Sequence, residues 1–341
     1  MINFINRKSG GGGDGSSLNV FCQLAEPTIK KGIWLRKEAE PEHYTYDEDV
    51  FIGGEWEPNG KYANIPYGFR YGAAAAIGTD IYLFGSLDYN TKTYKYNTLT
   101  NRYTQLTNIP YGFYGGSVVA VGTDIYLFGS GASTDNTKAY KYNTLTNSYT
   151  QLTNIPYNYN KGSAVAVGTD IYLFGSNTTN NYTKAYKYNT LTNSYTQLTN
   201  IPYNFTQGGI VAIGTNIYLL GSNNVNAKYY NYKYNTLTNT YSSLRSIPYG
   251  FWSGSATAVG TDIYLFGGND TPNYNYKYNT LTNSYTQLTN IPYGFSDGPS
   301  VVVGTNIYLL GGSYNSSVKV QVYAVETKSY QQNNLVVVSQ R

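Results

Sequence analysis

The sequence predicts an all-β protein, a six-bladed β-propeller that follows a short β-rich N-terminal attachment segment. Three observations lead to this fold class. The marker Ile-Pro-Tyr occurs six times, with prolines spaced 44, 46, 46, 46 and 44 residues apart, at Pro66, Pro110, Pro156, Pro202, Pro248 and Pro292. Each copy contains four short strand-like segments, and none has helical periodicity over a useful length. A strand-based repeat of about 40–50 residues is typical of propellers.

The second copy shows the four expected strands, at residues 116–121, 125–129, 138–143 and 148–152. The second segment, Ile-Tyr-Leu-Phe-Gly, is apolar on both faces, which indicates a sheet stacked between two neighbouring sheets. A ring of six such sheets buries faces that one sheet alone cannot bury. A linear solenoid is the alternative, and it would need capping repeats.

The expected domains are a flexible glycine-rich segment at residues 1–17, an attachment segment at 18–58 and the propeller at 59–341. The glycine-rich stretch at residues 10–17 has the composition of a flexible linker. Closing the ring requires the chain ends to meet, and the candidate clasp strands are residues 50–52 and 335–338.

The repeat resembles the kelch family over residues 65–334. The shared features are a strand ending in glycine, such as Ile81-Tyr82-Leu83-Phe84-Gly85, then a Tyr-x-Tyr-Asn strand, and then an aromatic residue at Tyr103 or Tyr149 where kelch repeats have tryptophan. The basic residue that kelch blades carry after the proline survives only as Arg70. The contacts that this arginine makes between kelch blades must come from other residues here, and tyrosine, with 41 copies, is the candidate.

The stretch from Glu26-Pro27-Thr28 through Gly32-Ile33-Trp34 resembles the leader of kelch-repeat proteins from phage and prophage tails of Gram-positive bacteria. This resemblance implies a tail-fibre protein in a virion tail or extracellular particle. Residues 1–58 would contact other tail proteins, the propeller would meet the cell surface, and a homo-oligomer is possible. The N-terminus has no signal-peptide apolar core, which fits release by lysis.

Comparing the six copies separates the two ends of the ring. The first turn of each blade is Gly-Thr-Asp or Gly-Thr-Asn, and the turn after the third strand is Asn-Thr-Leu-Thr-Asn in five copies. We call the end that carries these turns the constant end. The blade-to-blade connections and the second-to-third loops differ between copies and form the variable end. Variable loops on a rigid scaffold favour a recognition face. The alternative is drift after duplication, with tight turn geometry explaining part of the constancy elsewhere.

The candidate ligand-binding residues are the aromatic, amide and charged side chains of the variable end: Arg70, Tyr71, Tyr114, Asn160, Lys161, Gln207, Trp252, Asp297, Tyr89, Tyr182 and Tyr314. Aromatic rings cover the C–H faces of sugars, and amides and carboxylates take the hydroxyl groups. We therefore expect a bacterial surface polysaccharide as the ligand. A surface protein, or a protein partner of a kelch scaffold, is the alternative, because antibody loops use the same residue types.

We expect the protein not to be an enzyme and to need no cofactor or metal. The only histidine, His43, lies outside the repeats, and the only cysteine is Cys22. A Ser-His-Asp triad, a Cys-His pair and a histidine metal site are therefore excluded from the propeller. Two carboxylates can hydrolyse a glycoside, and the variable end offers Asp88, Asp135, Asp270 and Asp297. A glycan-modifying enzyme is thus the weaker alternative.

Nucleic acid and membrane partners are not expected. Residues 58–341 carry seventeen Lys or Arg against nine Asp or Glu, but this excess is spread over the copies and forms no basic cluster. A lysine that recurs in the Tyr-Lys-Tyr strand, such as Lys95, is interpreted as a solvated or edge-protecting position. No apolar run approaches the roughly 18 residues that span a membrane.

Overall fold

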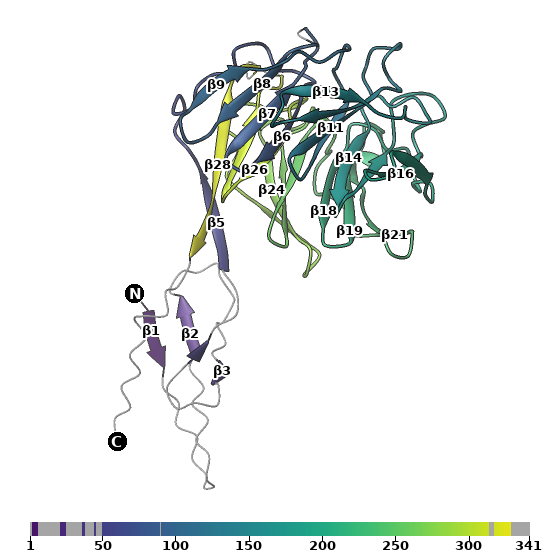
Figure 1. Ribbon diagram of the computed structural model, residues 1–341. Helices are drawn as coiled ribbons and strands as arrows, with labels where there is room; N and C mark the ends of the chain where they lie inside the picture. The colour runs from purple at the N-terminus through teal and green to yellow at the C-terminus, as the bar shows by residue number, and fades with distance from the viewer. Residues whose placement is uncertain are drawn as a thin grey trace. The chain divides into compact units, whose positions relative to one another are not determined.

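The computed structural model describes residues 50–88, 90–313 and 317–328, together with four short strands nearer the N-terminus (Figure 1). The chain divides into two compact units, one of Gly53–Glu326 and the other of Met1–Ile52 with Thr327–Arg341. The larger unit is the predicted six-bladed propeller, and each blade is an antiparallel four-stranded sheet. The short strands form two pairs: β1 (Ile2–Ile5) with β2 (Phe21–Leu24), and β3 (Arg36–Lys37) with β4 (Tyr44–Thr45).

The four strands of each blade follow one another from the axis outward. First strands lie innermost, each against those of both neighbouring blades: β6 (Ala73–Ile77), β10 (Ser117–Val121), β14 (Ser163–Val167), β18 (Gly209–Ile213), β22 (Ser255–Val259) and β26 (Ser300–Val303). Second strands are β7 (Asp80–Phe84), β11 (Asp124–Phe128), β15 (Asp170–Phe174), β19 (Asn216–Leu220), β23 (Asp262–Phe266) and β27 (Asn306–Leu310).

The two outer positions complete each sheet. Third strands are β8 (Thr93–Asn97), β12 (Ala139–Asn143), β16 (Ala185–Asn189), β20 (Asn231–Asn235), β24 (Asn275–Asn279) and β28 (Val320–Lys328). Fourth strands are β9 (Arg102–Gln105), β13 (Ser148–Gln151), β17 (Ser194–Gln197), β21 (Thr240–Ser243), β25 (Ser284–Gln287) and β5 (Val50–Trp56). The only helix in the described part of the chain is the 3₁₀ turn η1 (Ala227–Tyr229), which is not long enough to cross a membrane.

The core lies between the blades and is largely tyrosine. The second strand is buried on both faces, as predicted, with Ile81, Leu83 and Phe84 fully inaccessible. Its aromatic side chains contact the third strand of the next blade: the ring centroids of Phe84 and Tyr142 lie 5.7 Å apart. Phe128 with Tyr188 and Phe174 with Tyr234 repeat this edge-on contact. Such aromatic pairs stabilise beyond their buried area, and tyrosine side chains thus fill much of the interface between blades.

The ring is closed by β5, which lies beside β28 as the fourth strand of the sixth blade (Figure 1). Of the two candidate clasps, residues 50–52 belong to β5, and residues 335–338 lie outside the described residues. Trp56 takes the place of the fourth-strand tyrosine: its ring packs 5.1 Å from Tyr323, and its Nε1 donates to the Thr289 carbonyl in blade five. The propeller therefore includes residues before position 59, from the segment predicted to serve attachment.

The constant end owes its sequence to contacts between blades. The last asparagine of each Asn-Thr-Leu-Thr-Asn turn has a left-handed backbone, with φ of 51° at Asn147. Its Oδ1 accepts hydrogen bonds from the buried Tyr142 hydroxyl at 2.9 Å and from the Thr107 backbone N–H of the preceding connection at 2.9 Å. The same pair of bonds recurs at Asn101, Asn193, Asn239 and Asn283. Blade six lacks this turn because its outer strands come from opposite chain ends.

The recurrent lysine of the third strand is an ion-pair partner. Lys95, Lys141, Lys187 and Lys277 each lie 3.0–3.3 Å from the aspartate of the Gly-Thr-Asp turn of the same blade. The interpretation as a merely solvated or edge-protecting position was therefore incomplete. The cross-strand pair adds a second reason for the constancy of this end.

Candidate ligand-binding site

The blade-to-blade connections alternate between buried and exposed residues. In the first connection Ile65, Tyr67 and Phe69 are buried, and the next residue, Arg70, is exposed. The following glycine is fixed because a Cβ at Gly72 would lie 2.2 Å from the Phe69 ring and 2.7 Å from the Gly85 carbonyl oxygen. Between these fixed points each copy has two residues of variable identity, which we call the variable pair: Arg70-Tyr71, Tyr114-Gly115, Asn160-Lys161, Thr206-Gln207, Trp252-Ser253 and Ser296-Asp297.

The second residues of the six variable pairs form a closed ring of backbone hydrogen bonds around the propeller axis. Each N–H donates to the carbonyl oxygen of the equivalent residue in the preceding blade, and Tyr71 N–H closes the ring on Asp297. The six N–O distances are 2.6–2.9 Å. We call this feature the axial ring; its residues are Tyr71, Gly115, Lys161, Gln207, Ser253 and Asp297.

The first residues of the variable pairs fix the loops of the variable end through their backbone. Each carbonyl oxygen accepts a hydrogen bond from the N–H that starts the second-to-third loop of the same blade, as from Leu87 to Arg70 at 2.9 Å and from Gly131 to Tyr114 at 2.6 Å. The same bond occurs in the other four blades. The backbone of both residues is therefore fixed in every copy, whereas their side chains are left free to differ.

The axial ring residues all have left-handed backbone conformation. Their φ values are 55° at Tyr71, 60° at Gly115, 55° at Lys161, 52° at Gln207, 56° at Ser253 and 58° at Asp297. A non-glycine residue in this region costs about 1–2 kcal/mol relative to the right-handed one. Five of the six positions nevertheless carry side chains. Strain of this kind concentrates at functional sites, because the side chain is kept for another purpose.

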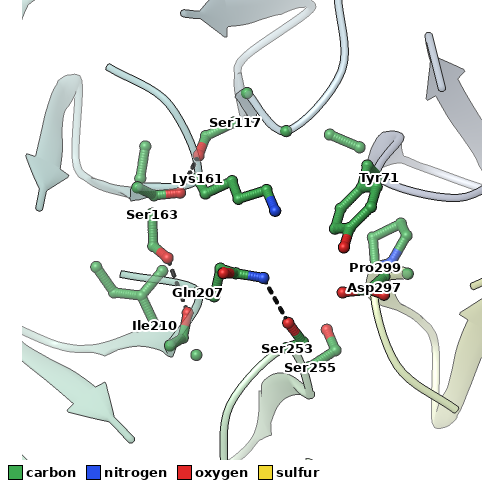
Figure 2. Close-up of a pocket in the computed structure, with 18 of the residues that line it drawn as sticks. Tyr71, Ser117, Lys161, Ser163, Gln207, Ile210, Ser253, Ser255, Asp297 and Pro299 are labelled. Carbon is green, nitrogen blue, oxygen red and sulfur yellow. Dashed lines mark hydrogen bonds between the residues drawn. The ribbon is translucent and has the colours of Figure 1, made fainter. Parts of the chain in front are cut away.

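These side chains surround a pocket on the axis (Figure 2). The cavity has a volume of about 230 Å³, and its wall consists of the axial ring, the six fixed glycines and the start of the innermost strands. This is just below the roughly 300–1,000 Å³ of pockets that enclose drug-sized ligands. The pocket is therefore of a size for a single sugar-like unit.

One side of the pocket is charged. The Asp297 side chain is 2% exposed; its Oδ2 accepts from Ser313 Oγ at 2.9 Å and lies 3.4 Å from an Arg70 guanidinium nitrogen. Its Oδ1 is buried and has no hydrogen-bond partner among the described residues. Figure 2 shows the Tyr71 hydroxyl and the Lys161 ammonium facing the same space. Burial and the Asp297 charge raise the pKa of Tyr71.

Tyr71 lies between two cations. The Lys161 Nζ is 4.4 Å from the centre of the Tyr71 ring, and the Arg70 guanidinium carbon is 4.8 Å from it. Such cation–π contacts hold long side chains in place. Burial lowers the pKa of Lys161 below its ordinary 10.5, and the Arg70 charge acts in the same direction.

The opposite side of the pocket is a neutral hydrogen-bonded row. Gln207 Nε2 donates to Ser253 Oγ at 2.7 Å, and Gln207 Oε1 accepts from Asn223 Nδ2 at 3.0 Å. Both atoms of the Gln207 amide are thereby oriented by partners within the protein. This side of the pocket is therefore preorganised in the absence of a ligand.

The structure brings four of the predicted site residues together on the pocket wall: Tyr71, Lys161, Gln207 and Asp297. Arg70 contacts Asp297 from beside the pocket, and Asn160 precedes Lys161 with its Oδ1 buried and unpaired. The remaining predicted residues stand outside the pocket wall or outside the described residues. Tyr114 packs on Gly131, Trp252 Nε1 donates to Asp270 Oδ1 at 3.1 Å, Tyr182 belongs to a second-to-third loop, and Tyr89 and Tyr314 lie outside the described residues.

Sequence reasoning missed polar residues that lie on the pocket wall. Ser253 is in the axial ring, and Ser117 and Ser163 donate from their Oγ to the glycine carbonyls of the next blade at 3.1 and 2.8 Å. The available signal was positional: Ser253 is the second residue of its variable pair, and the serines follow the fixed glycines. Selecting by residue type rather than by position overlooked them.

Two of the other acids of the variable end, Asp135 and Asp270, are engaged in separate ion pairs. Asp135 pairs with Lys138 at 2.7 Å, and Asp270 pairs with Lys228 at 2.7 Å. Within the described ranges, no group of three or more His, Cys, Asp or Glu side chains is arranged to hold a metal ion.

Comparison with known proteins supports the fold. No protein-family model and no curated protein matches the chain. Among solved structures, 758 chains match. One of them, titled "Structure of YjhT", has a TM-score of 0.66 and 14% sequence identity, over 78% of this chain and 95% of that one. At this identity the likeness shows a shared propeller architecture and does not extend to activity. The kelch and tail-fibre resemblances stay predictions.

Proposed function

We propose that this protein is a non-enzymatic binding module that recognises a bacterial surface saccharide through the variable end of its propeller. The observation that carries the proposal is the axial ring, where five non-glycine side chains occupy left-handed positions around one pocket. Glycine would relieve this strain, and blade two shows that the fold accepts glycine there, at Gly115. The side chains therefore have a role other than holding the blades together.

The chemistry of this end suits a saccharide. A rigid ring of polar groups, which includes the Tyr71 hydroxyl, can take the hydroxyl groups of a sugar. Trp252 adds an aromatic ring outside the axial pocket, oriented by its bond to Asp270. A polymer with one unit in the pocket could thus extend over neighbouring loops.

The biological setting we propose is the tail of a phage or of a tail-like particle, where the chain acts as the receptor-binding protein. Support for this setting comes from the resemblance of residues 26–34 to tail-protein leaders. In this setting the part of residues 1–58 that precedes β5 contacts other tail proteins, and the propeller contacts the host cell.

The test is binding of the full chain, fluorescently labelled, to whole bacterial cells and to an array of bacterial polysaccharides. The matched variant replaces Tyr71, Lys161 and Gln207 with glycine, a residue that suits their backbone. We expect this variant to fold and to lose binding by at least about tenfold, which corresponds to about 1.4 kcal/mol.

A control variant changes the opposite end of the ring. Leu99, Leu145 and Leu191 are about 80% exposed in the constant turns, at 79%, 79% and 82%. Replacing all three with serine should leave saccharide binding unchanged. Loss of binding in this control alone would move the site to the constant end. Binding to cells but to no polysaccharide, abolished by protease treatment of the cells, would indicate a protein partner instead.

A further inference from the structure

The axial pocket has one cation more than its carboxylate can balance. Arg70 lies within ion-pair distance of Asp297. Lys161 lines the pocket, but among the described residues no carboxylate lies within ion-pair distance of its ammonium group. Its side chain reaches across the axis toward the Tyr71 ring (Figure 2). A partly buried ammonium group without an anion is costly, so a ligand that supplies an anion gains from this arrangement.

The same pocket has an acceptor that lacks a donor. Asp297 is 9% exposed when its backbone is included, and no hydrogen bond from the described residues reaches its Oδ1. Buried polar atoms in proteins are nearly always paired, and the exceptions call for an explanation. Oδ2 is occupied by Ser313 and Arg70, so the carboxylate is held in place while Oδ1 is left for an incoming hydroxyl group.

The two features lie in a space for one small unit. The volume of about 230 Å³ admits a group the size of a monosaccharide. Gln207 and Ser253 are already bonded to each other on the opposite side. They present a fixed neutral surface there, so charge recognition is confined to the side of Lys161 and Asp297.

We propose that the axial pocket is the subsite that sets specificity, and that it takes an anionic saccharide unit carrying a carboxylate or phosphate next to a free hydroxyl group. Lys161 binds the anion, and Asp297 Oδ1 accepts the hydroxyl proton. Arg70 holds Asp297 and stands at the edge of the anion site. This inference rests on the proposed saccharide-binding function and specifies its ligand class.

The test titrates the full chain by NMR with four probes: glucuronic acid, glucose 6-phosphate, uncharged glucose and inorganic phosphate. We expect at least one acidic sugar to bind about tenfold or more tightly than glucose and than inorganic phosphate. A preference between glucuronic acid and glucose 6-phosphate identifies the anion as carboxylate or phosphate. Equal affinity for glucose and both acidic sugars would overturn the inference. Affinity for inorganic phosphate equal to that for the acidic sugars would overturn it as well.

Two variants assign the roles. Lys161→Met, which keeps most of the length of the side chain but not its charge, should reduce affinity for the acidic sugar to that for glucose. Asp297→Asn should lower the affinity for glucose and the affinity for the acidic sugar alike, each by about tenfold. Lys184→Met and Asp135→Asn are matched controls outside the pocket wall and should change neither affinity. Full acidic-sugar affinity in Lys161→Met would contradict the assignment.

The outcome is separable from that of the proposed function. If the chain binds cells and neutral polysaccharides but shows no preference for acidic sugars, the pocket inference fails and the proposed function stands. If the chain binds neither cells, polysaccharides nor any probe, both fail.

Discussion

Neighbouring blades are held together by different groups at the two ends of this propeller. At the constant end the blades are linked by side chains, because Asn147 and its equivalents accept bonds from a buried tyrosine and from the neighbouring connection. At the variable end the axial ring of backbone bonds links every blade to the next, whereas side-chain links such as Gln207 to Ser253 differ from blade to blade. Where side chains hold the fold, the sequence is constant. Where the backbone holds it, the side chains are free to serve recognition.

The constant end is constant for structural reasons. Constancy at one end follows from contacts, so it gives no separate evidence that the other end was selected for binding. The evidence comes instead from Lys161, Gln207 and the other non-glycine residues that bear left-handed strain around one pocket. Drift alone does not explain why non-glycine residues occupy these strained positions.

The largest expected effect concerns the tyrosine core that both ends share. Burial raises the pKa of Tyr142, Tyr188 and Tyr234 to about 12, and it raises the pKa of Tyr111 and Tyr157 further. The unfolded chain ionises its tyrosines near pH 10, so their contribution to stability is complete below pH 10 and is lost as the pH rises above it. We expect cooperative unfolding in alkaline solution, with tyrosinate absorbance and loss of β-sheet circular dichroism in one transition. Gradual ionisation without unfolding would contradict the burial.

Gly129→Ala should destabilise the interface between two blades at the variable end. Gly129 has a φ of 67°, and a Cβ there would lie 2.1 Å from the Tyr159 carbonyl oxygen of the next blade. We expect a loss of about 3 kcal/mol or more in the free energy of unfolding, from overpacking and backbone strain together. Gly122→Ala is the matched control, with a φ of 61° but open space around it, and should cost about 1 kcal/mol. Urea unfolding compares the two, and equal losses would show that the close approach is unimportant.

Asn147→Ala should weaken the constant end through the loss of hydrogen bonds, with a smaller effect. It removes the acceptor of the Tyr142 hydroxyl and of the Thr107 N–H. We expect the free energy of unfolding to fall by about 2–4 kcal/mol, because one of the two orphaned donors is buried. Saccharide affinity, measured on the same preparation, should be unchanged. A loss of affinity in the folded variant would mean that the two ends are not independent.

The smallest expected effect is a pH dependence of ligand affinity that depends on Lys161. Its pKa is lowered below 10.5 by burial, so its positive charge is lost at a lower pH than that of an exposed lysine. As the pH is raised, affinity for an acidic sugar should therefore fall at a lower pH than an exposed lysine would require, while the protein is still folded. The groups that face Lys161 do not titrate there, because the pKa values of Tyr71 and Arg70 are raised. Lys161→Met should remove the pH dependence, and its persistence would assign the titration elsewhere.

The sequence predicted the architecture closely because the repeat itself encodes it. The spacing of the prolines and the apolar second strands identify six blades without further information. The closing strand was left open between two segments, because β5 lacks the repeat pattern and Trp56 alone matches the outer-strand aromatic.

The lining of the axial pocket was predicted only in part. The variable pairs were visible in the copies, but the left-handed backbone that turns Lys161, Gln207 and Ser253 toward the axis was not. Residue type therefore favoured Trp252 and Tyr114, which stand outside the pocket wall, over Ser253, which belongs to it. The Asn-Thr-Leu-Thr-Asn turns were equally visible, but their bonds to the neighbouring connection depend on how consecutive blades pack against each other.

The central claim, that the axial ring residues are kept for a ligand and not for the fold, is tested most directly on Lys161→Gly. Its free energy of unfolding and its affinity for the acidic saccharide should be measured together. Glycine relieves the left-handed strain, so we expect stability to be unchanged or higher by up to about 1 kcal/mol, with affinity reduced at least about tenfold. Retained affinity, or a loss of stability of about 2 kcal/mol or more, would show that Lys161 serves the fold.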